Sequence, residues 1–339
     1  MYFNMDEWSQ EIIQAKDRRY LPVLYFPCLK PCGMGVIETV HDGKKMAEVM
    51  AEVIRRYPNI IAAMTGMDLS VDVEAFGARV KFKDTEAPTP DQILVTTPEE
   101  AEALAVPDVH AGRVDVFLDA VKEAQKLITD RPIFGGQLGP FSLAANLMEV
   151  QKALLATIHT PDMVQTLLRK STAFLIKRAQ AYKEAGANGI LLAEPTAGML
   201  SPKQAAVFSD CYVREIVDAV QDSSFYVVLH DCGKVTKMTG GMYGTGAKGL
   251  HFGNSVQMPK ILDSIPGDVL VFGNVDPALI TIKSAAEVTA ASEEVLEATA
   301  AYPNFVFSSG CDIPPLAPLE NCQALADACV DFNRRHGLI

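Results

Sequence analysis

Short apolar segments alternate with longer stretches of helical periodicity along almost the whole chain. Each apolar segment ends in glycine, proline, aspartate or another polar residue. This alternation is typical of a parallel α/β fold, because each strand is followed by a helix that returns the chain to the start of the next strand. We expect strands at Pro22–Phe26, Asp68–Val73, Ile133–Gln137, Gly189–Ala193, Tyr226–His230, Gly249–Phe252, Val269–Phe272 and Phe305–Ser308. Eight such strands predict a (β/α)8 TIM barrel, preceded here by an N-terminal helical extension.

Five segments between these strands carry apolar residues at three- and four-residue steps and are predicted to be helices. They are Lys44–Tyr57, Val114–Ile128, Pro161–Ala185, Lys203–Val220 and Ala285–Ala301. Thr160-Pro161 and Ser201-Pro202 have the form of an N-cap followed by a proline in the first helical turn, and Gly186 stands where a glycine ends a helix. No linker rich in proline, glycine and serine divides the chain, so we predict a single domain over residues 1–339.

Charge and composition exclude several classes of protein. The formal net charge is −12, and no run of lysine or arginine is present to neutralise a series of phosphates, so nucleic acid is not an expected partner. No apolar stretch reaches the roughly 20 residues that cross a membrane, and the first residues do not have the form of a secretion signal. Seven scattered cysteines argue against a disulfide framework, so we expect a cytoplasmic protein.

Two apolar strands end in residues that bind metals. His230 and Cys232 are separated by one residue at the end of the first, so both side chains point the same way from an extended backbone. Cys311 follows the second strand, Phe305–Ser308. Because the carboxyl ends of barrel strands face one common pocket, we expect all three side chains to meet there.

One imidazole and two thiolates are suitable ligands for Zn²⁺, and three protein ligands leave a coordination position open for a substrate, as in catalytic zinc sites. The alternative interpretation is structural. Buried cysteines are common as small apolar residues, and a histidine such as His230 can simply be a hydrogen-bonded part of the core.

Several stretches of the chain resemble the uroporphyrinogen decarboxylase superfamily. These are Glu74–Ala78, Gly139–Ala144, Glu194-Pro195, Gly310–Pro315 and Pro318–Asn321. The histidine-x-cysteine pair and the final glycine-cysteine are similar to the corrinoid:thiol methyltransferase branch of that superfamily. Decarboxylases carry an arginine-rich run near the first strand that holds the carboxylates of their substrate, whereas this chain has Phe26–Gly33 without arginine there. The resemblance therefore favours methyl transfer over decarboxylation.

The resemblance implies that His230, Cys232 and Cys311 bind zinc and that a small thiol, such as coenzyme M, is the methyl acceptor. The methyl donor is a corrinoid, methylcobalamin or a methylated corrinoid protein. Asp108 and His110 are part of a weak similarity to a corrinoid-binding motif, but Arg113 replaces its glycine, so we expect the corrinoid on a partner protein. Three alternatives remain: an enzyme of the same fold that loads the corrinoid from a methyl donor, a uroporphyrinogen decarboxylase, and a non-catalytic zinc barrel.

Three further polar residues are candidates for the same rim. Glu194 follows an apolar strand, and we expect it either to be a reserve zinc ligand or to orient His230. Its structural alternative is a charge beside a helix start. Asp72 and Gln137 are also candidates, because each lies near the end of a predicted strand, but they are weaker ones.

Overall fold

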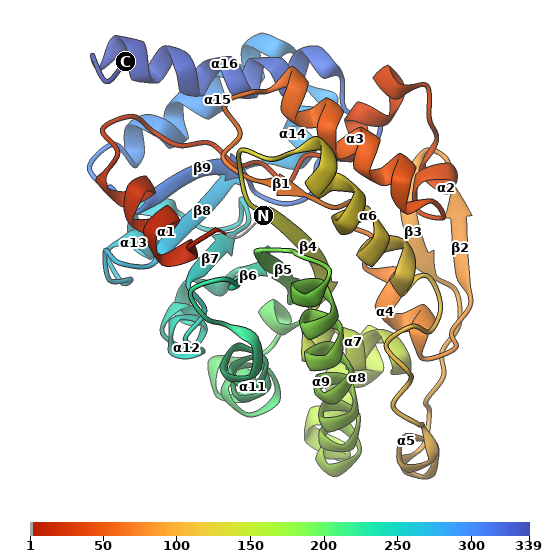
Figure 1. Ribbon diagram of the computed structural model, residues 1–339. Helices are drawn as coiled ribbons and strands as arrows, with labels where there is room; N and C mark the ends of the chain where they lie inside the picture. Colours follow the sequence, from red (N-terminus) through yellow and green to blue (C-terminus); the bar gives the residue numbers. More distant parts are fainter. Residues whose placement is uncertain (1–2) are drawn as a thin grey trace.

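A curled sheet of seven parallel strands forms the centre of the computed structural model, which describes residues 3–339 (Figure 1). The strand order is β1-β4-β5-β6-β7-β8-β9, and every neighbouring pair is parallel. The strands are β1 (Ala63–Met64), β4 (Ile133–Leu138), β5 (Gly189–Ala193), β6 (Tyr226–Asp231), β7 (Gly249–Phe252), β8 (Leu270–Val275) and β9 (Phe305–Ser309).

The eighth strand of the barrel is reduced to a single bridging residue. Tyr20 forms parallel bridges to both Ile60 and Phe307, and so connects the two edges of the sheet. The Leu21 amide donates to the Phe307 carbonyl at 2.9 Å, and the Ile61 amide donates to the Tyr20 carbonyl at 3.1 Å. The predicted (β/α)8 barrel is thus confirmed, with its closure made by one short segment.

Two predicted strands were wrong. Pro22–Phe26 is extended but forms no ladder, because the Val23 amide donates to Ser309 Oγ and the Val23 carbonyl accepts from the Ile313 amide. A 3-10 helix, η1 (Phe26–Cys32), begins at its end. Asp68–Val73 overlaps the helix α4 (Ser70–Ala75), and the strand lies earlier, at β1. Five of the six α4 residues are buried, so this helix has no polar face to reveal its period.

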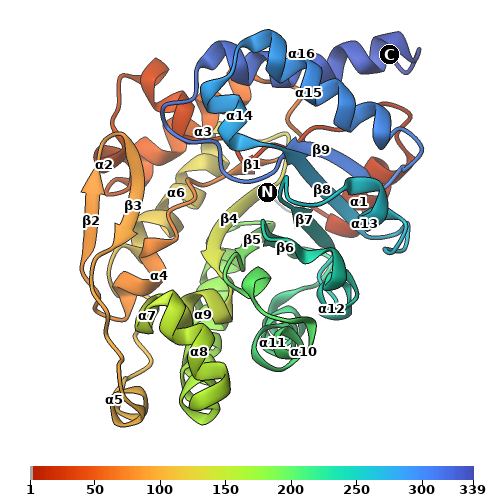
Figure 2. The ribbon, with the colours of Figure 1, turned by 180° about the vertical axis from the view of Figure 1, so that it is seen from behind.

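Helices surround the sheet, and all five predicted helices are present (Figures 1 and 2). Those that match the predictions are α3 (Gly43–Arg56), α6 (Val114–Leu127), α9 (Pro161–Glu184), the pair α10 (Pro202–Ala205) and α11 (Cys211–Val220), and α15 (Ala285–Ala298). A π-helical segment, η3 (Ala206–Asp210), joins α10 to α11. The remaining helices are α1 (Met5–Gln14), α2 (Val36–Thr39), α5 (Pro98–Ala103), α7 (Pro140–Met148), α8 (Val150–His159), α12 (Thr239–Gly244), α13 (Met258–Leu262), α14 (Pro277–Ile282) and α16 (Leu319–Arg335), together with the short 3-10 helices η2 (Ala197–Met199) and η4 (Val235–Lys237). Among the described residues, no helix is both long and apolar enough to cross a membrane.

The predicted helix signals differ in outcome. Ser201 caps α10 in a capping box with Gln204, and Gly186 has the positive φ of 97° expected just beyond α9. Thr160 precedes α9, but its side chain makes no capping hydrogen bond. The N-terminal helix α1 is the predicted helical extension.

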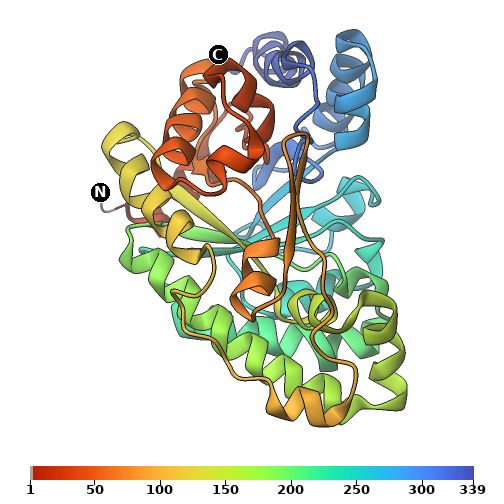
Figure 3. The same cartoon turned by 90° about the vertical axis from the view of Figure 1, so that its right-hand side faces the viewer.

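An antiparallel hairpin lies outside the barrel and was not predicted. It consists of β2 (Val80–Lys83) and β3 (Glu86–Pro90), and in Figure 3 it stands as a narrow orange ribbon beside α4. The Arg113 guanidinium lies 4.7 Å from the centre of the Phe82 ring and pairs with Asp68 and Glu74. This contact fixes the hairpin to the segments that surround α4.

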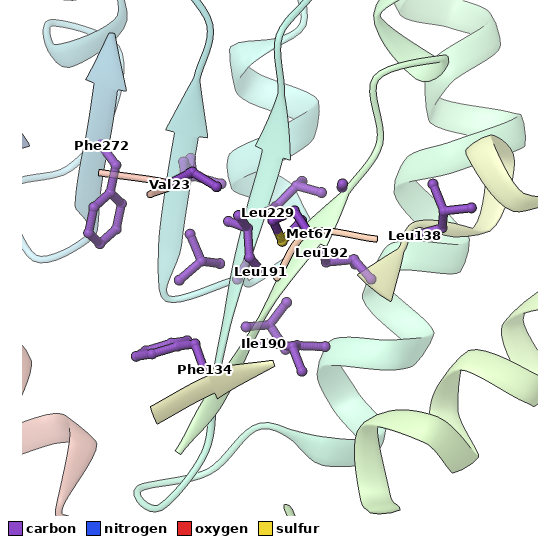
Figure 4. Packing of buried hydrophobic residues seen from close by; sticks show 14 of the residues in the cluster. Val23, Met67, Phe134, Leu138, Ile190, Leu191, Leu192, Leu229 and Phe272 are labelled. Atoms are coloured by element: carbon purple, nitrogen blue, oxygen red, sulfur yellow. The ribbon is translucent and has the colours of Figure 1, made fainter. Parts of the chain in front are cut away.

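Apolar side chains fill the inside of the barrel at the level of the strand centres (Figure 4). Phe134, Leu191 and Phe272 line a residual void of about 10 Å³ there. Packing of this density is typical of barrel interiors. Inside the barrel, the larger space lies at the carboxyl ends of the strands.

Candidate metal centre

The three predicted ligands lie together at the carboxyl ends of β6 and β9. His230 is the second-last residue of β6, Cys232 follows that strand directly, and Cys311 lies two residues beyond β9. Their ligand atoms are all within 4.8 Å of one another, and His230 Nε2 is 3.4 Å from Cys311 Sγ. Such a group can hold a metal ion.

Two glycines allow the strand ends to approach this closely. A Cβ atom on Gly253 would lie 2.6 Å from Cys232 Cα, and one on Gly310 would lie 2.8 Å from the Asn254 amide nitrogen. Neither position can accept a side chain without moving backbone. The close approach of the segments that carry Cys232 and Cys311 to their neighbours thus depends on Gly253 and Gly310.

The two cysteines influence each other's protonation. Contacts with Cys311 and then His230 lower the pKa of Cys232 to about 4, while the contact with Cys232, together with burial, raises the pKa of Cys311. A cation bound in the cluster would favour ionisation of both sulfurs.

His251 is a buried neighbour of this cluster that the sequence analysis did not single out. It lies on β7, directly paired with His230 in the parallel ladder, and its Nδ1 is 2.7 Å from His230 Nδ1. Its Nε2 is 3.1 Å from Ser308 Oγ on β9. Burial and the nearby His230 lower the pKa of His251 well below the ordinary value, so its ring is neutral. The only signal in the sequence is a histidine inside an apolar strand, which a core histidine gives equally.

A cavity of about 250 Å³ lies in front of the cluster. His230, Cys311 and Asp312 form its polar side. The rest of the wall is apolar and comes from four separate parts of the chain: Val23, Met67, Leu69, Ala87, Pro88, Leu191, Ala193 and Pro195. Because Ala87 and Pro88 belong to β3, the hairpin supplies part of the wall of the cavity.

Glu194 follows β5 and is 2% exposed. Its carboxylate accepts hydrogen bonds from the Phe141 and Ser142 amides, at 2.7 and 2.8 Å, and from Ser209 Oγ at 3.2 Å. Burial raises its pKa to about 7, and these hydrogen bonds oppose the rise. Its own amide donates to the His230 carbonyl at 2.8 Å. Glu194 thus connects the start of α7 to the strand that carries His230.

Asp72 and Gln137 lie away from the cluster, on the α9 side of the sheet. Asp72 is in α4, where its carboxylate forms an ion pair with Arg178 of α9 and accepts from the Leu138 amide at 2.8 Å. Gln137 Nε2 donates to the Leu175 carbonyl of α9 at 3.3 Å. The structure therefore brings His230, Cys232 and Cys311 together, but not Asp72 and Gln137.

The two aspartates beside the ligands differ in their contacts. Asp231 Oδ1 accepts from the Gly233 amide at 2.7 Å, and burial raises the Asp231 pKa to about 8. Burial also raises the pKa of Asp312, whose Oδ1 has no hydrogen-bond partner among the described residues. Asp231 therefore shapes the turn that carries Cys232, while the Asp312 side chain contributes to the wall of the cavity.

Comparison with known proteins gives matches over nearly the whole chain. Residues 20–332 match the family profile of uroporphyrinogen decarboxylase (URO-D). Methylcobamide:CoM methyltransferase MtbA of Methanosarcina acetivorans is 28% identical over 297 residues, which cover 86% of this chain and 85% of that protein. A uroporphyrinogen decarboxylase of Paraburkholderia xenovorans is 27% identical over 306 residues, 83% of this chain and 80% of that one. The solved structure of a methyltransferase from Methanosarcina mazei superposes with a TM-score of 0.86 at 26% identity, over 97% of this chain and 99% of the other.

Proposed function

The chain belongs to the uroporphyrinogen decarboxylase family, and from this premise we propose that it is a zinc-dependent enzyme that moves a methyl group between a corrinoid and a small thiol such as coenzyme M. The observation that carries the proposal is the convergence of His230, Cys232 and Cys311, of which His230 and Cys311 line the cavity. Similarity to methylcobamide:CoM methyltransferases over 86% of the chain supports the same assignment.

The donor set fits zinc. Two sulfurs and one imidazole nitrogen are the kinds of ligand that Zn²⁺ takes in catalytic sites. When bound, zinc would supply Lewis acidity that lowers the pKa of a substrate thiol, which is otherwise only a few per cent ionised at neutral pH.

The remaining chemistry is positioning by the protein. In the transfer, a bond forms between the substrate sulfur and the methyl carbon, the bond from cobalt to that carbon breaks, and the electron pair stays on the corrinoid. This displacement requires alignment of the two reactants more than proton transfer. The apolar wall of the cavity excludes water from the sulfur.

Glu194 is assigned a supporting role in this proposal. Its hydrogen bonds hold the first turn of α7 against β6, so it stabilises the strand that carries His230. We assign Asp72 and Gln137 to the packing of α9 on the sheet, because their polar contacts are made there.

A coupled assay of zinc content and methyl transfer tests the proposal. Purified protein should contain about one zinc ion per chain and transfer the methyl group of methylcobalamin to at least one member of a panel of small thiols. His230→Ala and Cys311→Ser should lose both zinc and turnover. Cys211→Ser is the matched control, because Cys211 is an exposed cysteine at the start of α11. Equal zinc in all variants would contradict the assignment.

The same preparations separate the alternatives. Turnover of a methoxyl or methylamine compound with a corrinoid acceptor, without thiol methylation, would identify the opposite half-reaction. Chelator-insensitive conversion of uroporphyrinogen would identify a decarboxylase. Zinc that is bound but whose ligands do not change when thiol is added would identify a non-catalytic barrel.

A further inference from the structure

We propose that His251, supported by Ser308, fixes His230 in the one tautomer that presents an unprotonated Nε2 to the metal position. This inference rests on the proposed function, because it assigns a positioning residue to the same zinc site. His251 would act through His230 without contacting metal or substrate.

The three residues form a continuous chain of polar contacts across β6, β7 and β9. His230 Nε2 faces Cys311 Sγ at 3.4 Å, so this nitrogen is on the side of the cluster. The opposite nitrogen, Nδ1, lies 2.7 Å from His251 Nδ1, and His251 Nε2 lies 3.1 Å from Ser308 Oγ.

Hydrogen-bond chemistry then determines the position of each proton. Two Nδ1 atoms at 2.7 Å share a hydrogen bond, so one of them carries the hydrogen and the other accepts it. A metal ligand must offer a lone pair, so a His230 that binds through Nε2 carries its hydrogen on Nδ1 and is the donor. His251 Nδ1 is then the acceptor, its own hydrogen is on Nε2, and that group donates to Ser308 Oγ.

Packing leaves neither ring free to turn. His230, His251 and Ser308 are 3%, 2% and 0% exposed. The two histidine rings meet edge to face with centroids 4.6 Å apart, and the Phe272 ring lies nearly parallel to that of His251 with centroids 6.3 Å apart. The arrangement is therefore preorganised, and the second histidine takes the place that a carboxylate or carbonyl has in many zinc sites.

The test compares two substitutions of His251. His251→Leu retains apolar volume but removes the acceptor for His230 Nδ1–H, and should weaken zinc binding by about 10- to 100-fold. His251→Asn places an amide oxygen near the former Nδ1 position and should restore affinity to within about threefold of wild type. Zinc affinity is measured by competition with a chromogenic chelator, and the visible spectrum of the Co²⁺-substituted protein reports the ligand geometry. Circular dichroism of each variant verifies the fold.

The tautomer is measured independently by ¹⁵N NMR of the metal-free wild-type protein. We expect the His230 hydrogen on Nδ1 and the His251 hydrogen on Nε2. A His230 hydrogen on Nε2, or a His251→Leu variant with wild-type zinc affinity and cobalt spectrum, would overturn the inference. A wild-type protein that binds no zinc would contradict the proposed function instead, while the NMR result would still decide the tautomer.

Discussion

Replacing Arg178 by methionine should destabilise the protein by up to about 4 kcal/mol at pH 7. Arg178 and Asp72 form an ion pair in which both side chains are 0% exposed. Burial raises the pKa of Asp72, and Arg178 opposes that rise. Without the guanidinium, the remaining carboxylate must either stay charged in the interior or take up a proton on folding.

Protonation of Asp72 limits how much the Arg178→Met substitution can lower the free energy of unfolding. Each pH unit between an ordinary aspartate pKa of about 3.9 and the working pH contributes about 1.4 kcal/mol, so the ceiling is about 4 kcal/mol at pH 7 and about 1.5 kcal/mol at pH 5. The destabilisation caused by Arg178→Met should therefore shrink as the pH falls. Replacing Asp72 by leucine in the same protein should recover part of the loss, because an apolar pair has no charge to bury.

Urea unfolding at pH 5 and pH 7 measures the destabilisation caused by Arg178→Met and its recovery when Asp72 is also replaced by leucine. Lys122→Ala is the matched control, because the ion pair of Lys122 with Asp119 is more than half exposed on both sides and should contribute under about 0.5 kcal/mol at either pH. A loss under about 1 kcal/mol at pH 7, or an equal loss at the two pH values, would refute the reasoning. Zinc content should not change, since the pair lies away from the metal cluster.

Two further predictions concern the rim of the barrel. Burial raises the Glu194 pKa from its ordinary 4.5 to about 7, so between these pH values the folded protein holds a proton that the unfolded chain releases. The free energy of unfolding should therefore fall by about 3 kcal/mol as the pH rises through this window. Glu194→Gln should flatten that part of the pH profile of urea unfolding, and an unchanged slope would refute the assignment. A Cβ on Gly198 would overlap the Asp231 carboxylate, so Gly198→Ala should lower the free energy of unfolding by about 1–3 kcal/mol and weaken zinc binding. Gly240→Ala should do neither, because a Cβ there meets no other atom within 4 Å. Equal effects of the two substitutions in thermal unfolding and chelator competition would contradict this prediction.

The strands that carry the metal cluster were predictable because each is a buried apolar run with a polar end. Val227, Val228 and Leu229 lead directly to His230, and the next turn contains Cys232. Since carboxyl ends of parallel strands meet at one edge, the convergence with Cys311 followed from the fold.

The first quarter of the barrel was harder to predict. The first strand pairing is only a bridge at Tyr20, and β1 has two residues, so neither gives a long apolar run. The helix α4 is buried on nearly all sides, and its apolar residues alternate with Asp72 as in a strand. Asp72 was therefore assigned to the rim, although its charge belongs to a pair with Arg178, 106 residues later.

Contacts between distant side chains were beyond prediction from the pattern. His251 acquires its significance only from the register of β6 against β7, which places its Nδ1 beside that of His230. The hydrogen bonds of Glu194 depend in the same way on where the first turn of α7 lies. Periodicity indicates which face a residue occupies, but not which partner it meets.

X-ray absorption at the zinc edge, recorded with and without a small thiol, tests the zinc assignment most directly. Without the thiol, the spectrum should contain two sulfur neighbours and one imidazole nitrogen from Cys232, Cys311 and His230. Addition of the thiol should increase the sulfur count by one. A purified protein that binds no zinc, or a metal whose sulfur count stays the same when thiol is added, would contradict the account.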